Sequence, residues 1–106
     1  MADTAKRLVG PQLLTNAAAT VYTTPASTTT ILRGIRVTNT SGTAATLFIS
    51  IGADAAGTRL CAGLSIPANS NYDWSGFQVL AAAEIVQAYS GTNNVLSMTA
   101  SGVEVT

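Results

Sequence analysis

Histidine is absent from the 106-residue sequence, and cysteine occurs only once, at Cys61. Without histidine the chain lacks the commonest general base and metal ligand, and it cannot form a Ser-His or Cys-His nucleophile. A single cysteine excludes a disulfide framework within the chain. Cys61 lies in an apolar run, where a free cysteine ordinarily packs as a small hydrophobe, so we expect it to be buried.

Charge is also scarce, because charged residues make up only 9% of the chain, against about 25% in a typical soluble domain. Five basic and five acidic residues give a formal net charge of zero. They form no basic stripe, so we expect no nucleic-acid partner. A surface with few charges costs little free energy to desolvate, which favours lasting contact with other protein subunits. We therefore expect a homo-oligomer.

The carboxylates are too dispersed to suggest a catalytic or metal site. They are Asp3, Asp54, Asp73, Glu84 and Glu104, each in a different segment. Their positions lack the tight spacing of a calcium loop, and nothing in the sequence brings two of them to one bond as a glycosidase requires. We predict no cofactor and no enzymatic activity.

Long hydrophobic runs are missing too. No window approaches the 18 or so apolar residues of a membrane span, so we expect no membrane partner. The apolar pairs near the N-terminus are short and are interrupted by Pro11, which does not fit a secretory signal. We expect synthesis in a cytoplasm.

One stretch, "ISIGADAAGTRL" (residues 49–60), imitates a phosphate-binding loop, because Gly52 and Gly57 are five residues apart. A true phosphate loop continues with Lys and then Ser or Thr, followed by a helix. Here Thr58 and Arg59 follow instead, and no helical pattern comes after them. We interpret the stretch as a turn between two strands.

The pattern that is present is period-two alternation, broken by Gly, Pro, Asn and Ser. It predicts an all-β fold, an antiparallel β-sandwich or jelly-roll-like domain of about eight strands, over residues 15–106. Residues 1–14, irregular and containing Pro11, are expected to form an N-terminal arm. The predicted strands cover residues 20–24, 30–38, 46–51, 60–66, 72–74, 78–80, 84–89, 95–100 and 103–105. Two short alanine-rich runs, near residues 18 and 82, are too short for stable helices.

Within these strands, residues 46–51 place Leu47 and Ile49 on the core face. Residues 30–38 place Ile31, Ile35 and Val37 inward and Leu32 outward. Arg33 falls among the inward set and violates the pattern. A charged residue at an inward position indicates a strand end, a bulge or an interface.

Three of the six aromatic residues, Tyr72, Trp74 and Phe77, cluster in "NYDWSGF". Such a cluster can stack on sugar rings, as in a carbohydrate-binding module that contacts a host glycan. Aromatic residues also anchor core edges and subunit interfaces, which is the interpretation we favour. Arg33 and Arg36 are further candidates for an interface or a glycan contact.

Several stretches resemble a family of small tailed-bacteriophage virion proteins. They are the run from "LVGPQLLTNAAATVYTTPASTTTILRGIRVTNTSG" to "ISIGADAAGTRL", then "SIPANSNYDW", "LAAAEIVQAYSG" and "ASGVEV". The resemblance implies a structural component of the virion, made in the host cytoplasm, that assembles with its own copies and packs on a tail or major capsid protein. It slightly favours a minor tail protein over a head-decoration protein. It carries no functional site residues.

Overall fold

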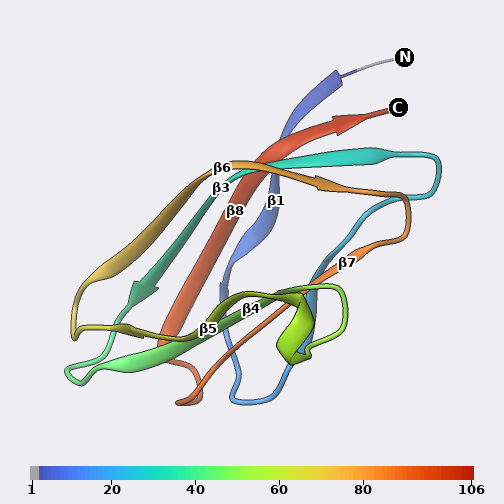
Figure 1. Ribbon diagram of the computed structural model, residues 1–106. Helices are drawn as coiled ribbons and strands as arrows, with labels where there is room; N and C mark the ends of the chain where they lie inside the picture. The colour runs from blue at the N-terminus through green and yellow to red at the C-terminus, as the bar shows by residue number, and fades with distance from the viewer. Residues whose placement is uncertain (1–2) are drawn as a thin grey trace.

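The computed structural model describes residues 3–106, and within that range the chain folds into eight β-strands and one short 3-10 helix (Figure 1). The prediction of an all-β fold is confirmed. The helix η1 (Ala56–Thr58) lies between β4 and β5. The strands are β1 (Asp3–Leu13), β2 (Ala19–Thr23), β3 (Thr29–Asn39), β4 (Ala45–Ile51), β5 (Arg59–Ile66), β6 (Asn71–Leu80), β7 (Ile85–Ser90) and β8 (Leu96–Val105).

The strands form two antiparallel sheets with jelly-roll connectivity. Sheet A has the order β1-β8-β3-β6, and sheet B has the order β2-β7-β4-β5. The chain pairs from its ends inward: β1 with β8, β2 with β7, β3 with β6 and β4 with β5. It is thus one long antiparallel ribbon, closed by the β4–β5 hairpin and wrapped so that successive pairs alternate between the sheets. This arrangement confirms the predicted sandwich and specifies it as a jelly roll.

The core lies between the two sheets and follows the strand alternation. Leu47 and Ile49 are fully buried, as predicted, and Cys61 is buried as well. Removing one such side chain typically costs about 2–5 kcal/mol, because the cavity left behind collapses only in part. The largest fully buried hydrophobic side chains are Leu14, Leu32, Val37, Leu47, Ile49, Ile66, Leu80, Leu96 and Met98.

Most of the expected N-terminal arm is a strand. Residues 3–13 form β1, an edge strand of sheet A whose ladder to β8 runs from the Asp3–Val105 pair to the Leu13–Ser97 pair. Residues 1 and 2 lie outside the described residues. Within β1 only Val9 is buried, so the strand shows no period-two signal in the sequence, and its pairing with β8 decides its conformation.

A β-bulge at Arg33 explains the violation of the pattern in β3. The registers of β3 with both β6 and β8 shift between Leu32 and Gly34. Against β8, Arg33 is the extra residue, whereas against β6 two residues, Gly76 and Phe77, lie opposite Arg33. The bulge lets Leu32 and Ile35 both face the core, since an unbroken strand would put residues three apart on opposite faces. Of the three explanations for Arg33, the bulge is therefore confirmed. The outward placement of Leu32 and the inward placement of Ile31 were wrong, because Leu32 is buried and Ile31 lies on the outer face beside the exposed Val79.

Two strands are longer than the sequence indicated. Residues 72–74 and 78–80 belong to one strand, β6, and residues 95–100 and 103–105 belong to one strand, β8. Gly76 and Gly102 interrupt the hydrophobic alternation at these points. Pairing of both strands with β3 on either side of the interruptions holds each of them as one strand.

A polar cluster closes the end of the sandwich that carries the termini. The Tyr22 hydroxyl donates to the Glu104 carboxylate at 2.6 Å and shares a hydrogen bond of 2.8 Å with the Thr30 hydroxyl. Lys6 Nζ lies 3.4 Å from the same carboxylate. Burial, together with the hydrogen bond to Glu104, raises the pKa of Tyr22 to about 12. This cluster ties β2 of sheet B to β3 and β8 of sheet A.

Candidate functional site

The sequence-predicted site residues all lie on β3 and β6, which pair in sheet A. The structure divides them between the two faces of the sheet. Tyr72 and Trp74 are partly buried and pack against the core. Phe77 points outward and is 63% exposed, more than any other large hydrophobic side chain in residues 3–106. The three rings therefore form no common platform for stacking on a sugar.

The two arginines lie on the outer face, at different places. Arg33 Nε donates to the carbonyl of Gly76 at 3.1 Å, which holds its guanidinium beside Phe77. Arg36 forms a two-pronged ion pair with Asp73, at 2.7 Å and 3.2 Å. The guanidinium beside Asp73 lowers the pKa of that carboxyl. Both partners are well exposed, so the pair contributes little to stability.

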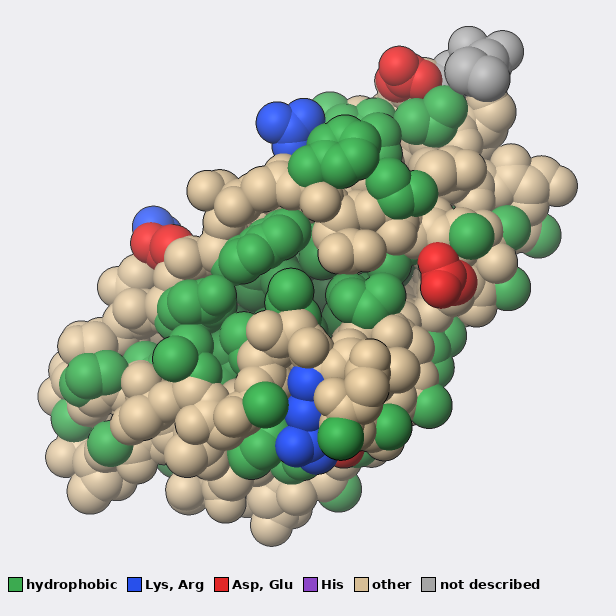
Figure 2. Space-filling model, viewed as in Figure 1, with side chains coloured by type: hydrophobic (Ala, Val, Ile, Leu, Met, Phe, Trp, Pro, Cys, Tyr) green, Lys and Arg blue, Asp and Glu red, His purple; other side chains and the backbone are tan. Residues whose placement is uncertain are grey.

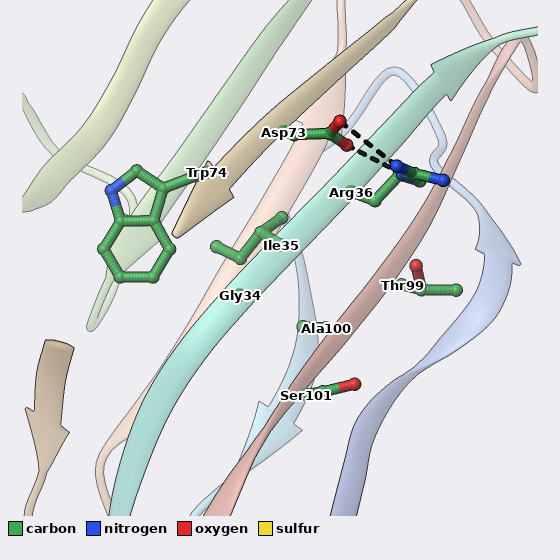
Figure 3. A pocket seen from close by; sticks show the side chains of 8 residues that line it. All are labelled: Gly34, Ile35, Arg36, Asp73, Trp74, Thr99, Ala100 and Ser101. Atoms are coloured by element: carbon green, nitrogen blue, oxygen red, sulfur yellow. Dashed lines mark hydrogen bonds and ion pairs between the residues drawn. The ribbon is translucent and has the colours of Figure 1, made fainter. Parts of the chain in front are cut away.

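A hollow of about 240 Å³ opens beside this ion pair, where β3 has a glycine instead of a side chain (Figure 3). Figure 3 shows Trp74 and Ile35 pointing away from Arg36, Thr99 and Ser101. The hollow thus lies on the outer face of sheet A, with Gly34 at its floor and polar side chains at its rim. Its lining residues are Gly34, Ile35, Arg36, Asp73, Trp74, Thr99, Ala100 and Ser101.

A second hydrophobic surface lies between the edge strands β5 and β6, where Figure 2 shows a hollow lined by green side chains. Tyr72 of β6 lies beside Cys61 of β5 across this edge, and Trp74 packs on the core nearby. Burial raises the pKa of the Cys61 thiol, so the thiol is a weak nucleophile. Cys61 therefore acts as a core residue that joins the two sheets.

The stretch that imitates a phosphate loop is the β4–β5 hairpin, as predicted. Its loop is closed by its own side chains: Asp54 accepts hydrogen bonds from Ser50 at 2.8 Å and from Arg59 at 3.2 Å and 3.3 Å. The Arg59 guanidinium also lowers the pKa of Asp54. The carboxylate and the guanidinium satisfy each other, so the loop presents no free cation to a phosphate.

Sequence reasoning missed the aromatic stack on the outer face of sheet B. The rings of Phe48 and Tyr89 lie parallel with centroids 4.5 Å apart, and the Arg59 guanidinium lies 5.1 Å from the Phe48 centroid. Arg59 also donates to the Tyr89 hydroxyl at 3.2 Å. The outward positions of Phe48 and Tyr89 follow from the alternation of their strands. That the two residues lie opposite each other follows only from the pairing of β4 with β7 in the folded sheet.

The described residues offer little for catalysis. No three cysteine or acidic side chains in residues 3–106 come together as a metal site. Asp54, Asp73 and Glu104 each pair with a cation, and Glu84 accepts a hydrogen bond from the backbone of Ala81. The same residues contain no helix long and apolar enough to cross a membrane. The outer face of sheet A, with Phe77 and the Gly34 hollow, is the candidate functional surface.

Neither a protein-family model nor a curated protein matches this sequence. Several solved structures share the fold. One is from the disulfide-linked pili of Bacillus endospore appendages, with a TM-score of 0.61, 13% identity, and coverage of 98% of this chain and 88% of that one. Another is from the T13 particle of the virus IBDV, with a TM-score of 0.58 and 11% identity; the match covers 97% of this chain and 31% of that one.

A third similar structure comes from virus-like particles of the extra small virus of the giant freshwater prawn Macrobrachium rosenbergii. Its TM-score is 0.55 at 7% identity, over 97% of this chain and 77% of that one. At such low identities these likenesses establish a shared fold. That fold extends over nearly the whole chain.

Proposed function

We propose that this chain is a non-enzymatic structural subunit of a bacteriophage particle, and that it acts by packing against its own copies and against another virion protein. The observation that carries the proposal is the jelly roll itself: nearly the whole chain matches subunits of viral particles and of a pilus. Jelly rolls suit this use because their two broad sheet faces and their loops are free for lateral contacts.

The scarcity of charge supports the same role. Of the ten charged residues, six are neutralised in three ion pairs within the chain: Lys6–Glu104, Arg36–Asp73 and Arg59–Asp54. Desolvating the remaining surface costs little free energy, as a permanent contact requires. The resemblance to tailed-phage proteins is what favours a phage particle, and within it a minor tail position over decoration of the head.

Particle fractionation tests the proposal. Particles are purified on a density gradient from a lysate of cells that carry the gene, and each fraction is searched for peptides of this chain. We expect the chain to sediment with the particles, and gold-labelled antibody to mark the tail. Labelling of the head would move the proposal to a decoration protein. A chain that stays at the top of the gradient would overturn the structural role.

A glycan-binding module is the competing function, and the exposure of Phe77 beside a polar hollow is the observation in its favour. The ring of Trp74 points to the other face of the sheet, so binding at this hollow is measured by isothermal titration calorimetry. We expect no change in the heat of injection on titration with host cell-wall polysaccharide. A saturable change that is lost in Phe77→Ser would favour the glycan function instead.

A further inference from the structure

The outer face of sheet A carries an apolar row across all four strands. The ladders place Ala5 beside Val103, Val103 beside Ile31, and Ile31 beside Val79. Val79 is 43% exposed, and Phe77 stands next to it on the same face of β6. In Figure 2, hydrophobic side chains gather over this part of β6, next to a cation. A cluster of this kind on an exposed sheet face is typical of a protein contact.

The same face has both a knob and a hole. Phe77 is the knob, and the hollow of about 240 Å³ over Gly34 is the hole. Gly34 pairs with Ser75, two residues before Phe77, so the knob and the hole lie side by side. When one surface carries both halves of a contact, a two-fold axis between them lets the knob of each copy enter the hole of the other copy.

The charges fit the same arrangement. Arg33 is held beside Phe77 and forms no ion pair within residues 3–106. Asp73 lies at the rim of the hollow and carries the complementary charge. A Phe77 ring that enters the hollow of another copy brings its neighbouring Arg33 towards the Asp73 of that copy. The Arg36 guanidinium at the rim can also lie against the face of the inserted ring.

The available area is sufficient. The molecule measures 46 Å by 25 Å by 19 Å, so a broad face exceeds the roughly 800 Å² that each partner contributes to a standard interface. The outer face of sheet B is less suited to a contact between copies, because its aromatic rings are stacked on each other and covered by Arg59.

We propose that the outer face of sheet A is a two-fold contact between two copies of this chain, with Phe77 of each copy seated in the Gly34 hollow of the other. The inference rests on the proposed structural role, and it specifies the face and the residues through which the chain meets its own copy. Ser75, between the knob and the hole, then lies close to the two-fold axis.

Sedimentation equilibrium of matched variants tests the contact. Phe77→Ser removes the knob and Gly34→Val fills the hole. A Cβ at Gly34 makes only an ordinary contact, 3.6 Å from the Trp74 carbonyl oxygen, so the second variant is expected to fold. Leu64→Ser is the control, because Leu64 is also an exposed edge-strand side chain but belongs to sheet B. Far-UV circular dichroism checks the fold of each variant.

We expect the wild type to be dimeric at tens of micromolar, both test variants to weaken the dimer at least about tenfold, and the control to stay within about twofold. A wild type that is monomeric at about 100 µM would overturn the contact. So would folded Phe77→Ser and Gly34→Val variants that dimerise as the wild type does.

Disulfide cross-linking tests the position of the axis. We expect Ser75→Cys to form a covalent dimer under mild oxidation, and Ser65→Cys on β5 to remain largely uncrosslinked. The native Cys61 is buried and adds little background. Equal cross-linking at both positions would contradict the assignment of the contact to the outer face of sheet A. If the chain dimerises through this face but is absent from particles, only the proposed function is overturned. If the chain is bound to particles but lacks this contact, only the inference is overturned.

Discussion

At the scale of single residues, two glycines of sheet A differ sharply in the space around them. A Cβ built on Gly102 overlaps the carbonyl oxygen of Ile31, which is backbone of the neighbouring strand β3. A Cβ on Gly34 meets only ordinary van der Waals contacts. Glycine is therefore required at 102, where two strands and the side chain of Leu8 converge, and is merely tolerated at 34.

Gly102→Ala tests this difference. We expect the substitution to lower the free energy of unfolding by about 2 kcal/mol or more, because the ladder between β8 and β3 must move apart. Gly34→Ala is the matched control and is expected to change it by less than about 0.5 kcal/mol. Urea denaturation measures both. Similar losses in the two variants would contradict the steric argument.

Burial of Tyr22, together with its hydrogen bond to Glu104, makes stability depend on pH at the alkaline end. The pKa of Tyr22 is raised from 10.0 to about 12, so the folded state holds this proton more tightly than the unfolded state does. The resulting stabilisation is complete below the unfolded pKa and is lost as the pH rises through the folded pKa.

Comparison of wild type with Tyr22→Phe isolates this effect. The phenylalanine variant has no hydroxyl proton to lose, so its stability changes less in this range. We expect the difference in unfolding free energy between the two proteins to narrow between about pH 9 and about pH 12. A difference that stays constant over that range would show that the Tyr22 proton is not linked to folding.

At the scale of elements, the bulge at Arg33 sets which faces of β3 are buried. Relative to β8, the structural requirement is one extra residue between Leu32 and Gly34, whatever its side chain. Deleting Arg33 would force residues 29–32 to the opposite faces of the sheet, and Leu32 would leave the core.

We therefore expect the deletion of Arg33 to abolish cooperative unfolding, whereas Arg33→Thr keeps the fold with a loss below about 1 kcal/mol. Thermal denaturation followed by circular dichroism distinguishes the two outcomes. A deletion variant that melts as sharply as the substituted one would mean that the strand can shift its register without cost.

The strands that the sequence predicted well are those with one buried face. In β4, the alternation of Leu47 and Ile49 with outward residues identifies both the strand and its core face. In β1 a single buried residue, Val9, gives no period, and the strand exists because β8 is available to pair with it. The bulge in β3 was visible as a violation, but the position of the extra residue required the neighbouring ladders.

The same limit applies to the candidate surface. The sequence identifies Trp74 and Phe77 as neighbours in an aromatic cluster. Because they are three residues apart, period two places them on opposite faces of the strand, and only the packing of β6 decides which face is buried. The hollow over Gly34 joins side chains of β3, β6 and β8, which only the folded sheet brings together. The stack of Phe48 on Tyr89 likewise depends on the pairing of β4 with β7.

At the scale of the whole molecule, the outer faces of the two sheets differ in how much hydrophobic side chain they leave exposed. The aromatic rings of sheet B pack on one another and against Arg59, whereas sheet A leaves Phe77 and Val79 exposed beside a hollow. A chain with so few unpaired charges has little electrostatic cost to associate through that face. The fold, the composition and the exposed face all fit a subunit that functions in an assembly.

The oligomeric mass of the purified protein in native mass spectrometry tests this central claim most directly. We predict a defined multiple of the chain mass, with the dimer as the smallest unit and larger closed multiples built from it. A monomer as the only species across the accessible concentration range would contradict self-assembly as the basis of function.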